Sequence, residues 1–182
     1  MKTTFFRSLA IFILMAGDFL FLGQFAKAEV TNHLVISEFA TRGLLSASDE
    51  FVELYNPTEN PISLIGWRLQ YKQALGGNWE NKTGIAGLPA EATIKPHAFY
   101  LLAGKDYLDQ NTDYRHTANW GLADNGHIRL TDLSGNTVDL VGYGTNVDSA
   151  EGEIAAPNHG TVANNKSVER KIGGEEIGRA HV

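Results

Sequence analysis

The sequence predicts an all-β domain built as a two-sheet sandwich. Beyond residue 30, short runs of β-type residues recur, and stretches rich in Gly, Pro, Asn and Asp bound them. We find no segment with the sustained i, i+3, i+4, i+7 apolar spacing of an amphipathic helix. The strands are irregularly spaced and show no internal repeat, which favours a sandwich over a propeller or a solenoid.

Composition limits the chain to one ordinary domain with a short extra segment. It has 182 residues, of which 43% are hydrophobic and 10% aromatic, and a domain of roughly 150 residues buries about two-thirds of its unfolded surface. There is no cysteine. Disulfides, thiolate zinc sites, iron–sulfur clusters and a cysteine nucleophile are therefore excluded.

Residues 1–28 have the three-part layout of a secretory signal peptide. A basic start precedes an apolar run over 9–17, and the segment ends in Ala-Lys-Ala at 26–28. Asp18 interrupts the apolar stretch, and a membrane anchor needs about 20 apolar residues in succession. We expect cleavage after Ala28 and a secreted, extracellular or periplasmic product.

Charge narrows the choice of partner. Without residues 1–28 the chain keeps 12 basic and 20 acidic residues, a net charge of −8, and its basic residues are scattered singly. Phosphate binding needs clustered Lys and Arg. We expect no nucleic-acid partner and no membrane contact after signal cleavage, and instead a protein, or a glycan on the cell surface. An acidic, exported chain without cysteine is typical of bacteria.

The first strands are expected at 34–39 and 51–55. The second is closed by residues 56–61, a turn-rich stretch with two prolines that cannot continue a ladder. Glu53 shares a strand face with Phe51. We expect Glu53 on the solvent face, paired across the sheet; the alternative is a buried carboxylate with an Arg or Lys partner.

The next strand, 67–72, has the clearest alternation. Trp67, Leu69 and Tyr71 face one side, and the polar residues between them face the other. We expect Trp67 to be a core anchor.

The later strands are expected at 98–103, 127–132 and 137–142. The last two flank Leu-Ser-Gly-Asn at 133–136, in which Gly135 supplies the positive φ of a hairpin turn.

Two long connections, 73–92 and 144–166, are candidate binding loops. Four aromatic residues stand in or near presumed loops, where they either stack on sugar rings or plug the ends of the sandwich: Trp79, Tyr107, Tyr114 and Trp120.

The sequence offers no catalytic constellation. It lacks a Gly-x-Ser-x-Gly elbow. Five of its six histidines, His33, His97, His116, His127 and His159, lie far apart without zinc-hydrolase spacing, and the sixth, His181, belongs to the tail discussed below. Calcium between acidic loops stays open, with Asp106, Asp109 and Asp113 as candidates. We assign no catalytic, cofactor-binding or metal-binding residue and expect no cofactor and no enzyme activity.

Several blocks in order resemble the lamin tail domain of bacterial secreted proteins. They are Leu-Val-Ile-Ser-Glu-Phe at 34–39, Glu-Phe-Val-Glu-Leu-Tyr-Asn at 50–56, Gly-Trp-Arg-Leu at 66–69, the block at 122–139, and Ser-Val-Glu-Arg at 167–170. The resemblance implies an immunoglobulin-like β-sandwich over residues 33–172. It also implies a module without catalysis.

The C-terminus departs from the family pattern, which continues to a closing aromatic segment. We expect the domain to lack its last strand and residues 173–182 to be a non-native tail. Ile-Gly-Arg-Ala-His-Val at 177–182 back-translates to a sequencing adapter, so we interpret it as an artefact.

Three functions follow from these observations. The leading hypothesis is an extracellular protein-interaction or surface-targeting module. The alternatives are a sandwich that binds carbohydrate or calcium, and the front end of a larger exported hydrolase whose catalytic part is missing.

Overall fold

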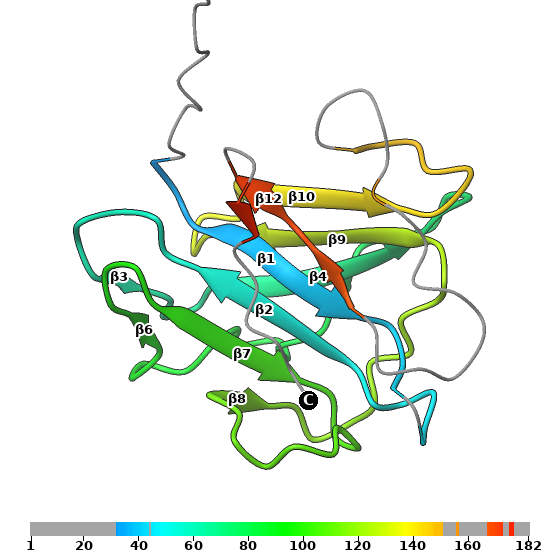
Figure 1. Ribbon diagram of the computed structural model, residues 1–182, viewed down its shortest axis with the longest axis horizontal. Coiled ribbons are helices and arrows are strands. Elements are labelled where there is room, and N and C mark those ends of the chain that lie inside the picture. Colours follow the sequence, from blue (N-terminus) through cyan, green and yellow to red (C-terminus); the bar gives the residue numbers. More distant parts are fainter. Residues whose placement is uncertain (1–31, 44, 151–155, 157–166, 173–174, 177–182) are drawn as a thin grey trace, which may run out of the picture.

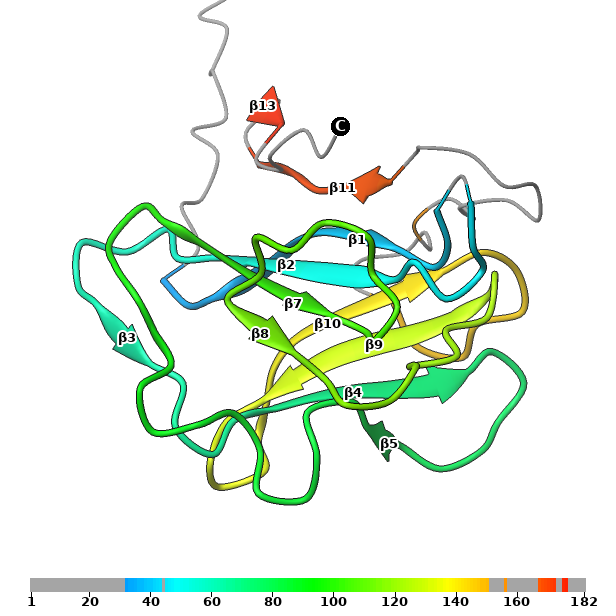
Figure 2. The same cartoon turned by 90° about the horizontal axis from the view of Figure 1, so that it is seen from below.

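The computed structural model describes residues 32–43, 45–150, 156, 167–172 and 175–176. The expected signal peptide, His159 and most of 151–166 lie outside the described residues, as does the expected tail at 173–182 apart from residues 175–176. Two sheets stack face to face as a sandwich, as Figures 1 and 2 show. The described part of the chain has no helix long and apolar enough to span a membrane.

The five-stranded sheet has the order β11-β1-β2-β7-β8. Its strands are β1 (Val35–Ala40), β2 (Phe51–Tyr55), β7 (Phe99–Ala103), β8 (Tyr114–Arg115) and β11 (Val168–Glu169). All neighbours pair antiparallel except β7 and β8, which are parallel. The predicted strands at 34–39, 51–55 and 98–103 are confirmed.

The four-stranded sheet has the order β10-β9-β4-β5. Its strands are β4 (Arg68–Gln73), β5 (Glu80–Asn81), β9 (Gly126–Thr131) and β10 (Thr137–Tyr143). The predicted hairpin is confirmed: β9 pairs with β10, and Gly135 in its turn has a φ of 86°. Asp132 accepts the Asn136 backbone N–H at 2.8 Å, and a hydrogen bond from the Asn136 side chain lowers the pKa of Asp132.

Two short pairs complete the fold. β3 (Ile62–Ser63) pairs with β6 (Thr93–Ile94), and β12 (Lys171–Ile172) pairs with β13 (Glu175–Glu176). Strands this short carry little alternation, so the sequence did not predict them.

The main core lies between the sheets. Leu54, Leu102 and Leu130 are fully buried there, and Leu69 and Tyr71 join them, as the alternation of β4 predicts. Trp67 differs from its prediction. It precedes β4 and is partly buried against the edge of the core, so it supports the core without being its anchor.

The prediction that Glu53 is exposed is wrong. Val52 and Leu54 point into the core as expected, yet Glu53 is 0% exposed. β2 is an inner strand, and its outer side also carries a covered cluster, Ala40, Phe51, Leu101, Ala103 and Tyr107. The Ser37 hydroxyl donates to the Glu53 carboxylate at 3.1 Å. An inner strand covered on both sides leaves no solvent face for this residue.

The loop aromatics divide between the interior of the sandwich and its surface. Trp120 is 3% and Tyr107 is 7% exposed, so both plug the sandwich, and Tyr114 packs partly buried against the main core. The connection at 73–92 is more ordered than a free loop, because it contains β5 and buries Leu88 in the core. Trp79, in the same connection, remains on the surface side of the sheet.

Candidate functional site

The candidate site is the outer side of the four-stranded sheet around Trp79. Leu69 and Tyr71 of β4 face the core, so Gln70 and Lys72 point outward. Register pairs Gln70 with Arg129 of β9 and with Asn81 of β5. We call the outward residues Gln70, Lys72, Trp79, Asn81 and Arg129 the Trp79 face.

Trp79 lies over two cations of this sheet. The Arg129 guanidinium is 4.1 Å from the centre of the indole, and the Lys72 ammonium is 5.3 Å away. Both distances are within the range of cation–π attraction. The His127 ring meets the same indole edge-on at 6.2 Å between centroids. The indole is thus held by its underlying sheet.

Amide groups fix the cation beneath the indole. Gln70 accepts from the Arg129 Nε at 2.8 Å and donates to the Asn81 side chain at 2.6 Å. Partial burial lowers the pKa of Arg129 from its usual value, but a guanidinium stays charged at any physiological pH. The face therefore presents an aromatic ring, two cations and two amides in fixed positions.

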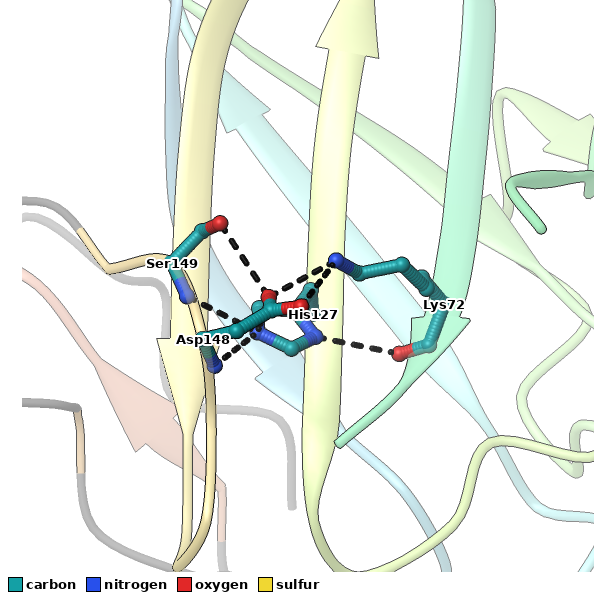
Figure 3. Close-up of polar contacts among 4 residues, drawn as sticks. All are labelled: Lys72, His127, Asp148 and Ser149. Carbon is teal, nitrogen blue, oxygen red and sulfur yellow. Dashed lines mark hydrogen bonds and ion pairs between the residues drawn. The ribbon is translucent and has the colours of Figure 1, made fainter. Parts of the chain in front are cut away.

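A buried histidine anchors the loop that follows β10 to this sheet. His127 is 0% exposed, and its Nε2 accepts the backbone N–H groups of Asp148 at 3.2 Å and Ser149 at 3.3 Å (Figure 3). Its Nδ1 lies 3.4 Å from the Lys72 carbonyl oxygen. Both ring nitrogens of His127 therefore contact backbone groups. Sequence spacing gave no sign of this contact.

An ion pair closes the same cluster at the surface. The Lys72 ammonium lies 2.7 and 2.9 Å from the two carboxylate oxygens of Asp148 (Figure 3). This hydrogen bond lowers the pKa of Asp148. Asp148 also lies 3.0 Å from the His127 Nε2.

Aspartate, histidine and serine are close here, but their arrangement does not suit nucleophilic catalysis. A triad needs the serine hydroxyl on the histidine nitrogen that takes its proton. Ser149 instead donates its hydroxyl to Asp148 at 3.1 Å, and the histidine Nε2 is occupied by backbone N–H groups. The cluster therefore holds the loop in place.

A second anchor fixes the chain before β9. Glu50 is 1% exposed, and its carboxylate accepts the backbone N–H groups of Trp120 and Gly121 at 3.0 Å and of Leu122 at 2.5 Å. Burial raises the pKa of Glu50, against the effect of these three bonds. The ammonium of Lys82, 7% exposed, donates to the Trp120 carbonyl oxygen beside it.

The other candidates from the sequence do not gather into a site. Asp106 pairs with Lys105 at 2.8 Å, Asp109 accepts the Asn111 N–H, and Asp113 accepts the Leu101 N–H at 2.7 Å. Among the described residues no three His, Asp or Glu side chains are placed to hold a metal ion. The described histidines other than His127, which are His33, His97 and His116, are partly or largely exposed on separate segments.

The two-sheet architecture defines the class of the protein, an immunoglobulin-like β-sandwich domain. The family model of the Lamin Tail Domain matches residues 27–145, and the chain belongs to this family. This match confirms the resemblance drawn from the blocks between residues 34 and 139. The Ser-Val-Glu-Arg element at 167–170 lies beyond the match. The search of curated proteins gives no match.

Proposed function

We propose that the chain is a non-catalytic interaction module that works outside the cell and binds a protein partner through the Trp79 face. The observation that carries the proposal is the indole of Trp79 held over Arg129 at 4.1 Å. Trp and Arg dominate the binding energy of protein interfaces. A side chain already held in place loses little entropy when a partner covers it.

Charge supports a partner with an acidic patch. The chain is acidic overall, with a net charge of −6, yet this side of the sheet carries Arg68, Lys72 and Arg129. Two of these cations are held by neighbouring side chains: Lys72 forms an ion pair with Asp148 at 2.7 Å, and Arg129 donates a hydrogen bond to Gln70 at 2.8 Å. Cations held in fixed positions favour oriented contacts with a protein over binding of a phosphate backbone, which needs a continuous row of basic side chains.

A glycan is the second candidate, and the same indole favours it. Trp79 has the amides of Gln70 and Asn81 beside it, and an aromatic face with nearby amides suits a sugar ring, which offers an apolar side and hydroxyl groups. Array binding distinguishes the two, because a protein-binding module gives no saturable signal on sugars.

The partner experiment compares the chain with its Trp79→Ala variant. Each is immobilised and exposed to the exported proteins of the source organism, and retained proteins are identified and titrated individually. Leu45→Ala is the matched control, because Leu45 is 78% exposed in the β1–β2 loop. A partner that binds the control at full strength but Trp79→Ala at least about tenfold more weakly supports the proposal, as expected for a hot spot. Equal binding to all three contradicts it.

Export and absence of catalysis are tested directly. The mature protein should begin at Glu29, and a product that keeps Met1 and stays with the membrane contradicts export. The purified chain should hydrolyse no ester, phosphodiester, glycoside or peptide, with or without divalent metal. Turnover that disappears when one carboxylate or histidine is replaced would overturn the non-catalytic assignment.

A further inference from the structure

A pocket of about 390 Å³ lies away from the Trp79 face, where β6, β7 and the residue before β8 meet. Figure 1 shows β8 beside β7, and β6 close to the start of β7. Small-molecule sites usually have volumes of about 300–1,000 Å³. This pocket is at the lower end of that range, a size suited to one side chain of a partner.

The pocket has an excess of negative charge. Its lining includes two acidic residues, Glu91 and Asp113, and one basic residue, Lys95. Asp113 is fixed by the Leu101 N–H, which donates to it at 2.7 Å. Among the described residues Lys95 forms no ion pair with either carboxylate. A positively charged guest thus meets two acceptors whose charge Lys95 does not neutralise by contact.

The pocket wall includes a buried tyrosine with spare hydrogen-bonding capacity. Tyr100 is 7% exposed, and its hydroxyl donates to the Asp113 carbonyl oxygen over a long 3.5 Å. Burial, followed by the charges of Asp113 and Glu91, raises the pKa of Tyr100 to about 12. The two carboxylates therefore act together at the hydroxyl, which stays protonated and polar at neutral pH.

An aromatic ring completes the lining. Phe99 stands in the wall, and its ring is held against Tyr55 with 4.8 Å between centroids. A planar guanidinium can stack on such a ring while it donates to carboxylates in a fixed fork, whereas an ammonium is a point charge without this geometry.

We infer that this pocket binds the side chain of an arginine presented by a partner polypeptide, with Glu91 and Asp113 as acceptors and Phe99 as the stacking surface. The inference is independent of the proposed function, because the Trp79 face belongs to β4, β5 and β9 and shares no residue with the pocket. A partner can use either surface without the other.

The test titrates the complete 182-residue chain with acetyl-Gly-Arg-Gly-amide and follows backbone amide shifts by NMR. The matched probes contain citrulline, which keeps the shape and loses the charge, or lysine, which keeps the charge and loses the fork. We expect shifts at Phe99, Tyr100 and Asp113, and affinity for the arginine peptide about threefold to tenfold above that for citrulline, the range of one exposed charge contact or two.

Two charge variants give opposite expectations. Glu91→Gln should weaken arginine binding by about threefold to fivefold, and Lys95→Gln should strengthen it by about twofold to threefold. Both residues are exposed, so neither change should unfold the chain, and Leu45→Ala should leave the affinity unchanged. Equal binding of arginine and citrulline, lysine binding as strong as arginine, shifts confined to other strands, or weaker binding in Lys95→Gln would each overturn the inference.

Discussion

Replacing Glu50 by alanine removes the acceptor of three backbone N–H groups in the segment before β9. These belong to Trp120, Gly121 and Leu122, and the bonds to Trp120 and Leu122 are buried. Because the N–H groups of Trp120 and Leu122 are buried, water can replace the lost carboxylate as their acceptor only if the end of the sandwich opens. The substitution therefore tests whether this anchor holds the segment.

The expected loss of stability follows from those donors. A buried donor left without an acceptor costs about 1–3 kcal/mol, so the two buried groups cost about 2–6 kcal/mol. Part of this is offset, because the ionised carboxylate is itself penalised by burial, which raises its pKa. We expect Glu50→Ala to lower the free energy of unfolding by about 2–4 kcal/mol.

Urea denaturation followed by tryptophan fluorescence measures this loss, since Trp120 lies in the anchored segment. Asp109→Ala is the control, because Asp109 caps the exposed N–H of Asn111, and surface substitutions usually change stability by less than about 0.5 kcal/mol. A loss below about 1 kcal/mol for Glu50→Ala, with the slope of the transition unchanged, would show that Glu50 does not anchor this segment.

Three further predictions concern the core, the sheet-to-sheet contact and pH. Trp67→Ala should cost about 2 kcal/mol in urea melts, below the 3–5 kcal/mol typical of a fully buried aromatic, and a loss above about 4 kcal/mol would show that Trp67 is a core anchor after all. Arg170→Ala should lower the free energy of unfolding by about 3 kcal/mol, because Arg170 donates to the buried Asp139 at 2.9 Å and to the Ile36 carbonyl oxygen at 2.9 Å. The control is Arg68→Ala, which should lower it by less than about 1 kcal/mol because Arg68 donates to an exposed carbonyl oxygen. Burial raises the pKa of Tyr107 to about 12, as it does for Tyr100. The contribution of these two tyrosines to stability is therefore complete below pH 10 and is lost as pH rises from 10 through 12. Phenolate absorbance and circular dichroism should change in that window, and titration of both tyrosines near pH 10 in the folded chain would contradict their burial.

The sandwich was predictable because local patterns fix much of it. Alternation of Leu69 and Tyr71 with polar neighbours placed β4 correctly, and Gly135 between two β-type runs placed the β9–β10 hairpin. Glu53 was not predictable in the same way. The pattern of β2 says which side faces the core, but it contains no information on what covers the other side, and here a second apolar cluster does so.

The candidate site depends on contacts far apart in sequence. Trp79 was noticed as an aromatic in a Gly-rich connection, but Arg129 reaches it through the register of β9 against β4. The anchoring roles of Glu50 and His127 could not be predicted in this way, because each side chain binds backbone N–H groups. Any residue has such a group, so the sequence does not mark the partner. Such anchors become visible when the fold brings the segments together.

Hydrogen–deuterium exchange is the sharpest test of whether the chain binds through the Trp79 face. It compares the free chain with the chain bound to a partner that binds Trp79→Ala more weakly. We predict protection of residues 68–82 and of β9, with the five-stranded sheet unchanged and the partner chemically unaltered. Protection confined to the five-stranded sheet, or conversion of the partner into a product, would contradict the claim that this domain acts by binding through the Trp79 face.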